Sequence, residues 1–195
     1  MHRMLIVVLL GAATVFSTNA QAASFGSSPF YAGASLGPSE ETGYNNNVAV
    51  KVFAGYRILA SLAIEAEAGF LGKFTESLGP GSTTTDESYV AAVMAVGRLP
   101  IDDHNLLYGK VGGTMFHDLT TNTVIAGSIY CPSCTSNIYT SSSNTYSGLT
   151  FGVGYQHRFV DLEDQGTWWP DTVRVEAQAY GNNVNILDVG VIYDF

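Results

Sequence analysis

Ten ionisable side chains lie on the polar face of segments in which polar and apolar residues alternate. The set contains five bases and five acids, namely Lys51, Arg57, Glu65, Glu67, Lys110, Arg158, Arg174, Glu176, Asp188 and Asp194. Charges held together away from water are tolerated only when they are paired and hydrogen-bonded. The balance therefore predicts an interior network of ion pairs. Rearranging pairs, such as Glu65 with Lys110 or Arg174, would permit a small ion leak; a purely structural polar core is the interpretation that we favour.

The two cysteines form the motif Cys131-Pro132-Ser133-Cys134. In a cytosolic protein with a βαβ pattern, this spacing would indicate a redox site. Here the motif lies in a polar stretch rich in Ser, Thr and Asn, and two thiolates alone do not form a structural zinc site. We expect a small disulfide that closes a loop. Thiol redox chemistry and two unbonded cysteines are the alternatives.

Catalytic chemistry would need a nucleophile and a base within reach of each other. His117 and His157 fall on the apolar face at strand ends, and His104 lies in a turn. Ser88 and Ser147 begin strands without an Asp or His partner nearby in the pattern. No metal-ligand spacing, phosphate loop or dinucleotide motif appears, so the sequence predicts no cofactor and no enzyme. A lipid-modifying membrane enzyme remains the alternative.

Strands must position these side chains, because polar and apolar residues alternate with period two and no segment keeps a helical period. Eight such segments lie near residues 30–37, 48–57, 61–71, 88–98, 106–117, 146–158, 171–181 and 186–195. Long connections at 38–47, 72–87 and 118–144 alternate with shorter turns. An even strand count with this alternation is typical of outer-membrane barrels. The sequence predicts an all-β fold, an eight-stranded antiparallel up-and-down transmembrane β-barrel.

The apolar face of the predicted strands is nearly free of charge, as contact with lipid requires, because a midplane Arg or Lys there costs about 2–4 kcal/mol. Only Arg98 takes this face, at a strand end where a long side chain can reach the interface. The aromatic side chains expected to fill the lumen are Tyr31, Phe53, Tyr89, Tyr108 and Tyr180. A soluble lipocalin-like barrel, with the apolar face lining a ligand pocket, is the alternative.

Residues 1–22 are predicted to be a secretory signal peptide. A basic start, an apolar run and the Ala20-Gln21-Ala22 cleavage motif support this interpretation. Residues 23–195 then form one barrel domain, whose 21 Gly, 11 Tyr and 10 Phe suit a barrel. The formal net charge of −9 argues against nucleic acid as a partner.

The last strand has one wholly apolar face, formed by Leu187, Val189, Val191, Tyr193 and Phe195. A chain that ends in this way resembles the C-terminal strand of outer-membrane β-barrels. The resemblance implies that these residues serve as the assembly signal for the barrel-assembly machinery.

The stretches 30–37, 108–113 and 189–195 resemble the first, fifth and last strands of the OmpA/OmpX-type eight-stranded barrels. This resemblance implies an integral protein of the Gram-negative outer membrane, in contact with its lipid and lipopolysaccharide, with a structural or surface-interaction role. The outer loops are expected to be acidic. The third loop, 118–144, is expected to contact a host or surface ligand, because long loops are often functional. A narrow ion channel and a lipid-modifying enzyme are the alternatives.

Overall fold

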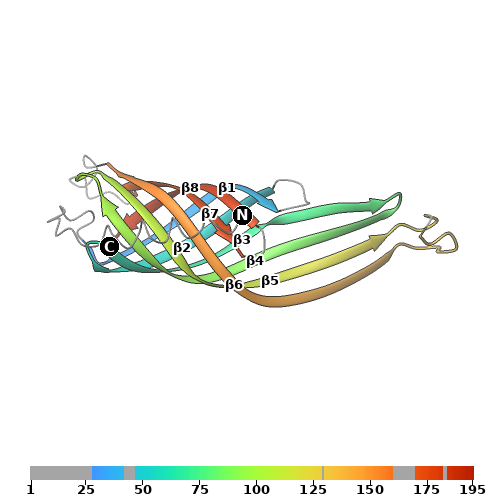
Figure 1. Ribbon diagram of the computed structural model, residues 1–195. Coiled ribbons are helices and arrows are strands. Elements are labelled where there is room, and N and C mark those ends of the chain that lie inside the picture. Colours follow the sequence, from blue (N-terminus) through green and yellow to red (C-terminus); the bar gives the residue numbers. More distant parts are fainter. Residues whose placement is uncertain (1–27, 42–46, 129, 160–169, 182–183) are drawn as a thin grey trace, which may run out of the picture.

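Eight antiparallel strands close into one ring in the computed structural model, which describes residues 28–41, 47–128, 130–159, 170–181 and 184–195 (Figure 1). The strands are β1 (Phe30–Glu41), β2 (Asn47–Leu59), β3 (Leu62–Gly79), β4 (Ser82–Pro100), β5 (Asn105–Val124), β6 (Ile138–Arg158), β7 (Thr172–Tyr180) and β8 (Val184–Asp194). Each strand pairs with its neighbours in sequence, and β8 closes the ring on β1. The predicted fold class is confirmed. The predicted signal peptide, 1–22, lies outside the described residues.

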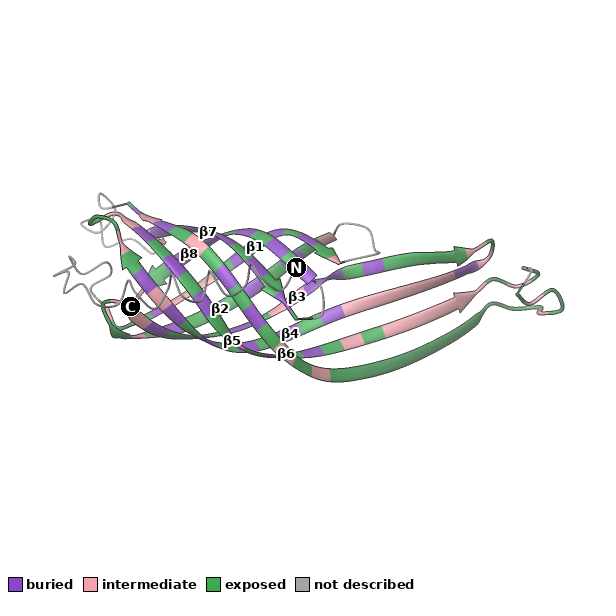
Figure 2. Ribbon diagram, in the orientation of Figure 1, coloured by how far each residue is buried: buried purple, intermediate pink, exposed green. Residues whose placement is uncertain are grey.

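The barrel buries charged side chains and exposes aliphatic ones, the reverse of a water-soluble core (Figure 2). On β2, Lys51 is 2% exposed whereas the next residue, Val52, is 57% exposed. On β8, Asp188 is buried between the outward-facing Leu187 and Val189. Soluble monomers rarely expose so much contiguous apolar surface. The outward face therefore suits lipid, and the lipocalin-like alternative, with the apolar face inside, is wrong.

The apolar face predicted for the last strand lies on the outside of the barrel. Its five members, Leu187, Val189, Val191, Tyr193 and Phe195, are all exposed. The rings of Tyr193 and Phe195 pack edge to face with centroids 5.0 Å apart. Their role as an assembly signal remains a prediction. No helix of the described residues is long and apolar enough to cross a membrane.

The two faces of β4 are reversed relative to the sequence-based expectation. Arg98 points inward and is 8% exposed, whereas Tyr89 points outward and is 40% exposed. The register explains this orientation: Glu65 of β3 lies opposite Met94, and residues directly opposite each other point to the same face. The prediction was wrong because both faces of β4 are rich in Ala, Val and Gly. Hydrophobic alternation therefore does not indicate which face of β4 points into the lumen.

Strands β3 to β6 run much further than expected, because the predicted loops 72–87 and 118–144 are largely strand. Polar composition suggested loops, but Thr and other β-branched residues also favour strands. The hairpin between β3 and β4 turns at Pro80 and Gly81, with Gly79 and Gly81 at φ 132° and 88°. We call the part beyond the ring, residues 72–79, 82–88, 118–124 and 138–146, the distal sheet; it forms the long projection in Figure 1.

The two hairpins of the distal sheet are fastened to each other at their ends. The backbone N–H of Ile125 donates to the carbonyl of Gly81 over 2.8 Å. The Tyr130 hydroxyl donates to the carbonyl of Leu78 over 2.9 Å. Beside these contacts, Cys131 and Cys134 form a disulfide with their Cα atoms 5.4 Å apart. Because β4 also pairs with β5 along this whole length, from Ser82 opposite Val124 to Ser88 opposite Asp118, the four strands project as one sheet.

Candidate functional site

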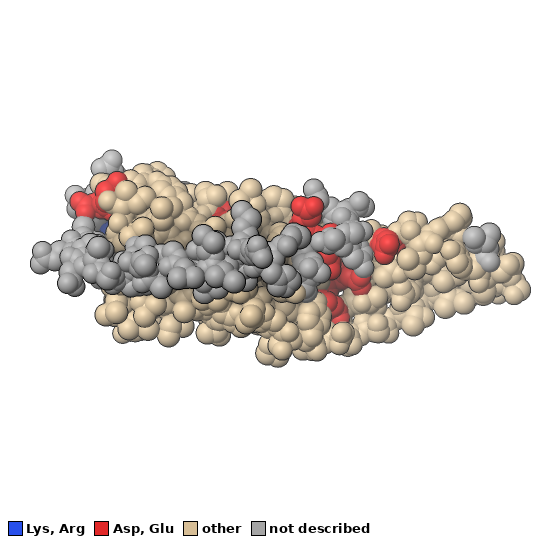
Figure 3. Space-filling model, in the orientation of Figure 1, with Lys and Arg blue, Asp and Glu red and all other residues tan. Residues whose placement is uncertain are grey.

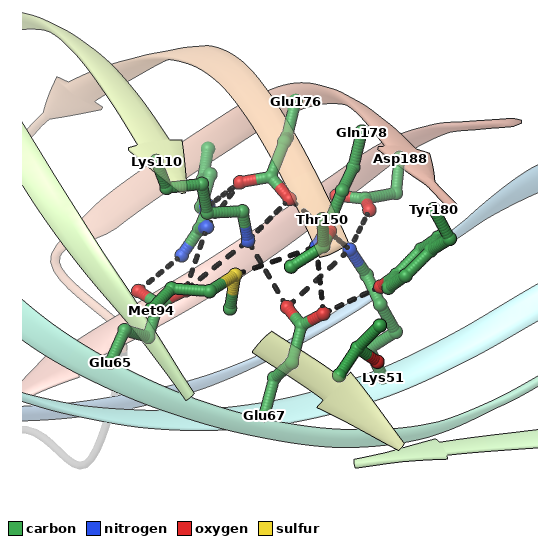
Figure 4. Close-up of polar contacts among 12 residues, drawn as sticks. Lys51, Glu65, Glu67, Met94, Lys110, Thr150, Glu176, Gln178, Tyr180 and Asp188 are labelled. Carbon is green, nitrogen blue, oxygen red and sulfur yellow. Dashed lines mark hydrogen bonds and ion pairs between the residues drawn. The ribbon is translucent and has the colours of Figure 1, made fainter. Parts of the chain in front are cut away.

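The centre of the barrel holds a cluster of buried ion pairs contributed by β2, β3, β5, β7 and β8 (Figure 4). Arg174 of β7 donates from both terminal nitrogens to the two carboxylate oxygens of Glu65, each over 3.0 Å. Such bidentate pairing is strong and fixes geometry. Lys110 of β5 lies 2.7 Å from Glu176 and 3.3 Å from Glu65. Three strands are thereby tied together across the lumen.

Lys51 and Glu67 extend this cluster toward the distal sheet. The Lys51 ammonium lies 2.7 Å from Asp188 and 3.1 Å from Glu176. Glu67 accepts hydrogen bonds from Gln178 over 2.8 Å and from the Tyr180 hydroxyl over 2.5 Å. Glu67 also lies 3.1 Å from Lys110, so the two halves form one network. Seven of the ten predicted interior charges therefore meet in a single cluster.

The other three predicted charges lie at the end of the barrel with the short connections. Arg57 pairs with Asp194 over 2.6 Å. Arg158 lies 3.5 Å from Asp171, an acid that the sequence analysis did not select. Arg98 is also inside at this end and donates to the carbonyl of Ala60 over 3.3 Å.

Aromatic rings and glycines complete the filling of the lumen. The guanidinium of Arg174 lies between two rings, 4.3 Å from the centroid of Phe53 and 4.7 Å from that of Tyr108. The Tyr108 hydroxyl donates to Glu176 over 2.6 Å. A Cβ on Gly154 would lie 2.2 Å from that hydroxyl, so the glycine makes room for the tyrosine. An eight-stranded barrel is just wide enough for side chains to fill, and this interior is filled.

Among the described residues, the candidate histidines His117 and His157 contact neutral side chains, whereas Ser88, which was expected to lack an acidic partner, donates to Asp118 over 2.6 Å. His117 Nδ1 lies 2.9 Å from the hydroxyl of Thr145, and His157 Nδ1 lies 2.9 Å from the side-chain oxygen of Asn105. Both histidines face outward. Within the described segments, no group of three or more His, Cys, Asp or Glu side chains is arranged to hold a metal ion.

Acidic side chains gather where the ring meets the distal sheet (Figure 3). Glu41, Asp86 and Asp118 come close enough there to interact electrostatically. Asp118 accepts hydrogen bonds from Ser88 over 2.6 Å and from Tyr146 over 2.7 Å. We call this group the acidic belt.

Further out, the distal sheet is mostly uncharged, and hydroxyl-bearing residues face each other across its strands. One such row runs through Thr75, Thr85, Thr121 and Ser141 on neighbouring strands. This register was not predicted, because the sequence analysis placed these residues in loops. The sequence analysis therefore did not identify the residues that form the surface of the distal sheet, apart from its acidic residues and the third loop.

The comparisons with known proteins agree with this architecture. The sequence matches the family described as outer membrane protein beta-barrel domain over residues 8–193. The N-terminal β-barrel domain of Pseudomonas aeruginosa OprF is 8% identical, with 86% of this chain and 98% of that chain covered and a TM-score of 0.52. No curated protein matches the sequence.

Two further solved structures are similar at lower TM-scores. Ail, the attachment invasion locus protein of Yersinia pestis, is 14% identical, with 86% of this chain and 99% of that chain covered and a TM-score of 0.45. Neisserial surface protein A is 18% identical, with 86% and 98% covered and a TM-score of 0.48.

Proposed function

This chain belongs to the outer membrane protein beta-barrel domain family, and from this premise we propose that its barrel is a structural anchor and its distal sheet a surface for contact outside the cell. The protein is an integral β-barrel of the Gram-negative outer membrane. Barrels of this kind place short turns in the periplasm and long connections outside. In that orientation the distal sheet extends beyond the lipid.

The observation that carries this proposal is the contrast between a filled lumen and a large projecting sheet. The side chains of the central charges are 0–2% exposed, so a permeant solute or a substrate would have little access to them. The distal sheet presents exposed side chains on β3, β5 and β6, and those of β4 are partly buried or buried. We assign the protein no catalytic role, and we assign the apolar end of β8 to recognition by the barrel-assembly machinery.

The charges of the distal sheet restrict the chemistry of its partner. The sheet and its base carry Glu76, Asp86, Glu87 and Asp118 but only one base, Lys73. Lys73 is itself paired with Glu87 over 2.9 Å. A polyanion would be repelled by this surface, so a neutral or cationic partner fits it best. Contact with lipopolysaccharide is assigned to the outward face and rim of the barrel.

The test replaces residues 75–85 and 119–143 with short Gly-Ser turns and leaves the ring intact. Unboiled samples should still migrate differently from boiled ones on a gel, which reports a folded barrel. Cells that display the shortened chain should lose adhesion to cultured epithelial monolayers and to one another. Unchanged adhesion with the folded, shortened chain would contradict the proposal.

A further inference from the structure

The β3 edge of the distal sheet is protected against pairing with another strand. It carries Lys73 and Glu76, and its register with β4 shifts once after Phe70 and again after Ser77. The Asn47 side chain donates to the carbonyl of Lys73 and covers part of the edge. Charges and bulges are the devices by which natural edge strands avoid further pairing. This edge is therefore blocked.

The β6 edge lacks these devices. Pairing of β6 with β7 begins only at Thr150, so residues 138–145 pair with β5 on one side and with no described strand on the other. The segment is Ile-Tyr-Thr-Ser-Ser-Ser-Asn-Thr, without a charge or a proline. All eight residues are exposed, on both faces of the sheet (Figure 2). A regular, neutral edge of this length offers its backbone N–H and C=O groups to another strand.

We propose that the β6 edge pairs antiparallel with the β6 edge of a second copy of this chain held in a facing membrane. This inference rests on the proposed function, because it assumes that the distal sheet lies outside the cell. It adds the identity of one partner, which is the same chain on a neighbouring cell.

Symmetry and side-chain chemistry favour a second copy over a foreign peptide. Two identical strands can pair antiparallel about a two-fold axis perpendicular to the sheet, and Ser142 is the central residue of segment 139–145. An axis at Ser142 places Tyr139 opposite Thr145 and Ser141 opposite Ser143. Aromatic–β-branched pairs and hydroxyl pairs stabilise neighbouring strands. A foreign peptide would need side-chain pockets for specificity, whereas this edge presents short hydroxyl side chains.

The direction of β6 determines where the second copy must lie. The strand leaves the ring along the long axis of the molecule (Figure 1). Antiparallel pairing therefore points the two barrels in opposite directions. Copies in one membrane point the same way and could bring these edges together only in parallel. The contact is thus one between two membranes.

The charges of the sheet permit this arrangement. The acid nearest to the edge is Asp118, which lies on β5 opposite Asn144. With strands about 4.8 Å apart and about 3.4 Å per residue, the two Asp118 side chains would lie roughly 20 Å from each other. That separation exceeds the Debye length of about 8 Å at physiological ionic strength. The acidic belts therefore do not oppose the contact.

The test uses the full chain in two populations of phosphatidylcholine vesicles that carry different dyes. Vesicles that both contain the protein should become tethered, as seen by coincident fluorescence. Ser142→Lys should abolish tethering, because it places two ammonium groups at the axis. The matched control is Ser77→Lys on the blocked β3 edge, which should tether like the wild type.

A second pair of variants keeps the test decisive if Ser142→Lys fails to fold. Residues opposite each other in a ladder have Cα atoms about 4.5–5.5 Å apart, which a disulfide can span. Ser142→Cys should therefore yield an oxidised dimer that joins the two dyes, whereas Ser77→Cys should not.

Several outcomes would overturn the inference. They are the absence of tethering by the wild type, equal tethering by Ser142→Lys, and tethering to vesicles that lack the protein, which would identify lipid as the partner. If vesicles fail to tether while adhesion to epithelial monolayers still requires the distal sheet, only this inference fails and the proposed function stands.

Discussion

Arg174 is held from every side: Glu65 and Glu176 accept its hydrogen bonds, and Phe53 and Tyr108 cover its faces. A buried charge pair adds little net stability, but removing one partner leaves the other charge unpaired, which costs about 3–5 kcal/mol. Arg174→Leu should therefore lower the free energy of unfolding by about 3–5 kcal/mol, measured by urea titration in lipid vesicles.

The control for this prediction is Lys73→Leu in the distal sheet. Lys73 is 57% exposed and pairs with Glu87, and exposed pairs contribute about 0–1 kcal/mol. The double variant Arg174→Leu/Glu65→Leu should recover most of the loss. If Arg174→Leu and Lys73→Leu lowered the free energy of unfolding equally, the charges left in the central cluster would not be destabilised by the loss of Arg174, and the prediction would be wrong.

Asp102 gives the β4–β5 turn a dependence on pH. Hydrogen bonds from the Asn105 side chain and from the backbone N–H of His104 lower the pKa of Asp102 below its ordinary value of 3.8. Because the pKa of Asp102 is lower in the folded state than in the unfolded state, the turn is stabilised at every pH above the unfolded-state pKa. This stabilisation is lost as the pH falls through the folded-state pKa. Amide exchange at His104 and Asn105, measured relative to the intrinsic rate at each pH, should therefore accelerate below about pH 4.

Replacing Asp102 by Asn should remove this acid-dependent change in amide exchange. Asp103→Asn, in the same turn, should leave it intact. An acceleration that persists in Asp102→Asn would show that another group loosens the turn.

At the scale of single strands, small residues decide what the lumen can hold. Gly154 of β6 lies against the Tyr108 hydroxyl, whereas Gly113 of β5 points outward with no atom within 4 Å of an added Cβ. Gly154→Val should lower the free energy of unfolding by about 1–3 kcal/mol through overpacking. Gly113→Val should be neutral or stabilising. Equal unfolding midpoints for the two variants would contradict a filled lumen.

The strands also show where sequence reasoning succeeds. Alternation identified all eight strands and the inward side of seven, because charged and apolar residues separate cleanly there. It failed on β4, whose faces are both apolar, and the pairing of β4 with its neighbours, such as Met94 with Glu65 and Arg98 with Tyr108, determines which way Arg98 points.

The distal sheet was underestimated for a different reason. Its Thr, Ser and Asn residues have a polarity typical of loops, and their β structure depends on pairing with neighbours far away in sequence. Thr84 meets Asn122, for example, through a hydrogen bond of 2.6 Å. Alternation selected ten charges for the lumen and missed Arg98, and the ion-pair partners of these charges required the register.

On the scale of the whole molecule, the filled lumen bears on the channel alternative. Tyr108 and Arg174 occupy the centre of the cross-section, and truncating both leaves Glu65, Glu67 and Glu176 along the opened path. The wild type should show no steady conductance in planar lipid bilayers. Tyr108→Ala/Arg174→Ala should conduct with a preference for cations, since the loss of Arg174 leaves four acids against two bases in the cluster.

The control for the conductance measurement is the outward-facing pair Val153→Ala/Val175→Ala, which should remain closed. The wild type and both double variants should first show the gel shift of a folded barrel, so that currents from misfolded protein can be excluded. Steady wild-type currents as large as those of Tyr108→Ala/Arg174→Ala would mean that the ion pairs open on their own. The narrow-channel function would then replace the structural role of the barrel, because a lumen that conducts without truncation cannot be held shut by the contacts of Arg174.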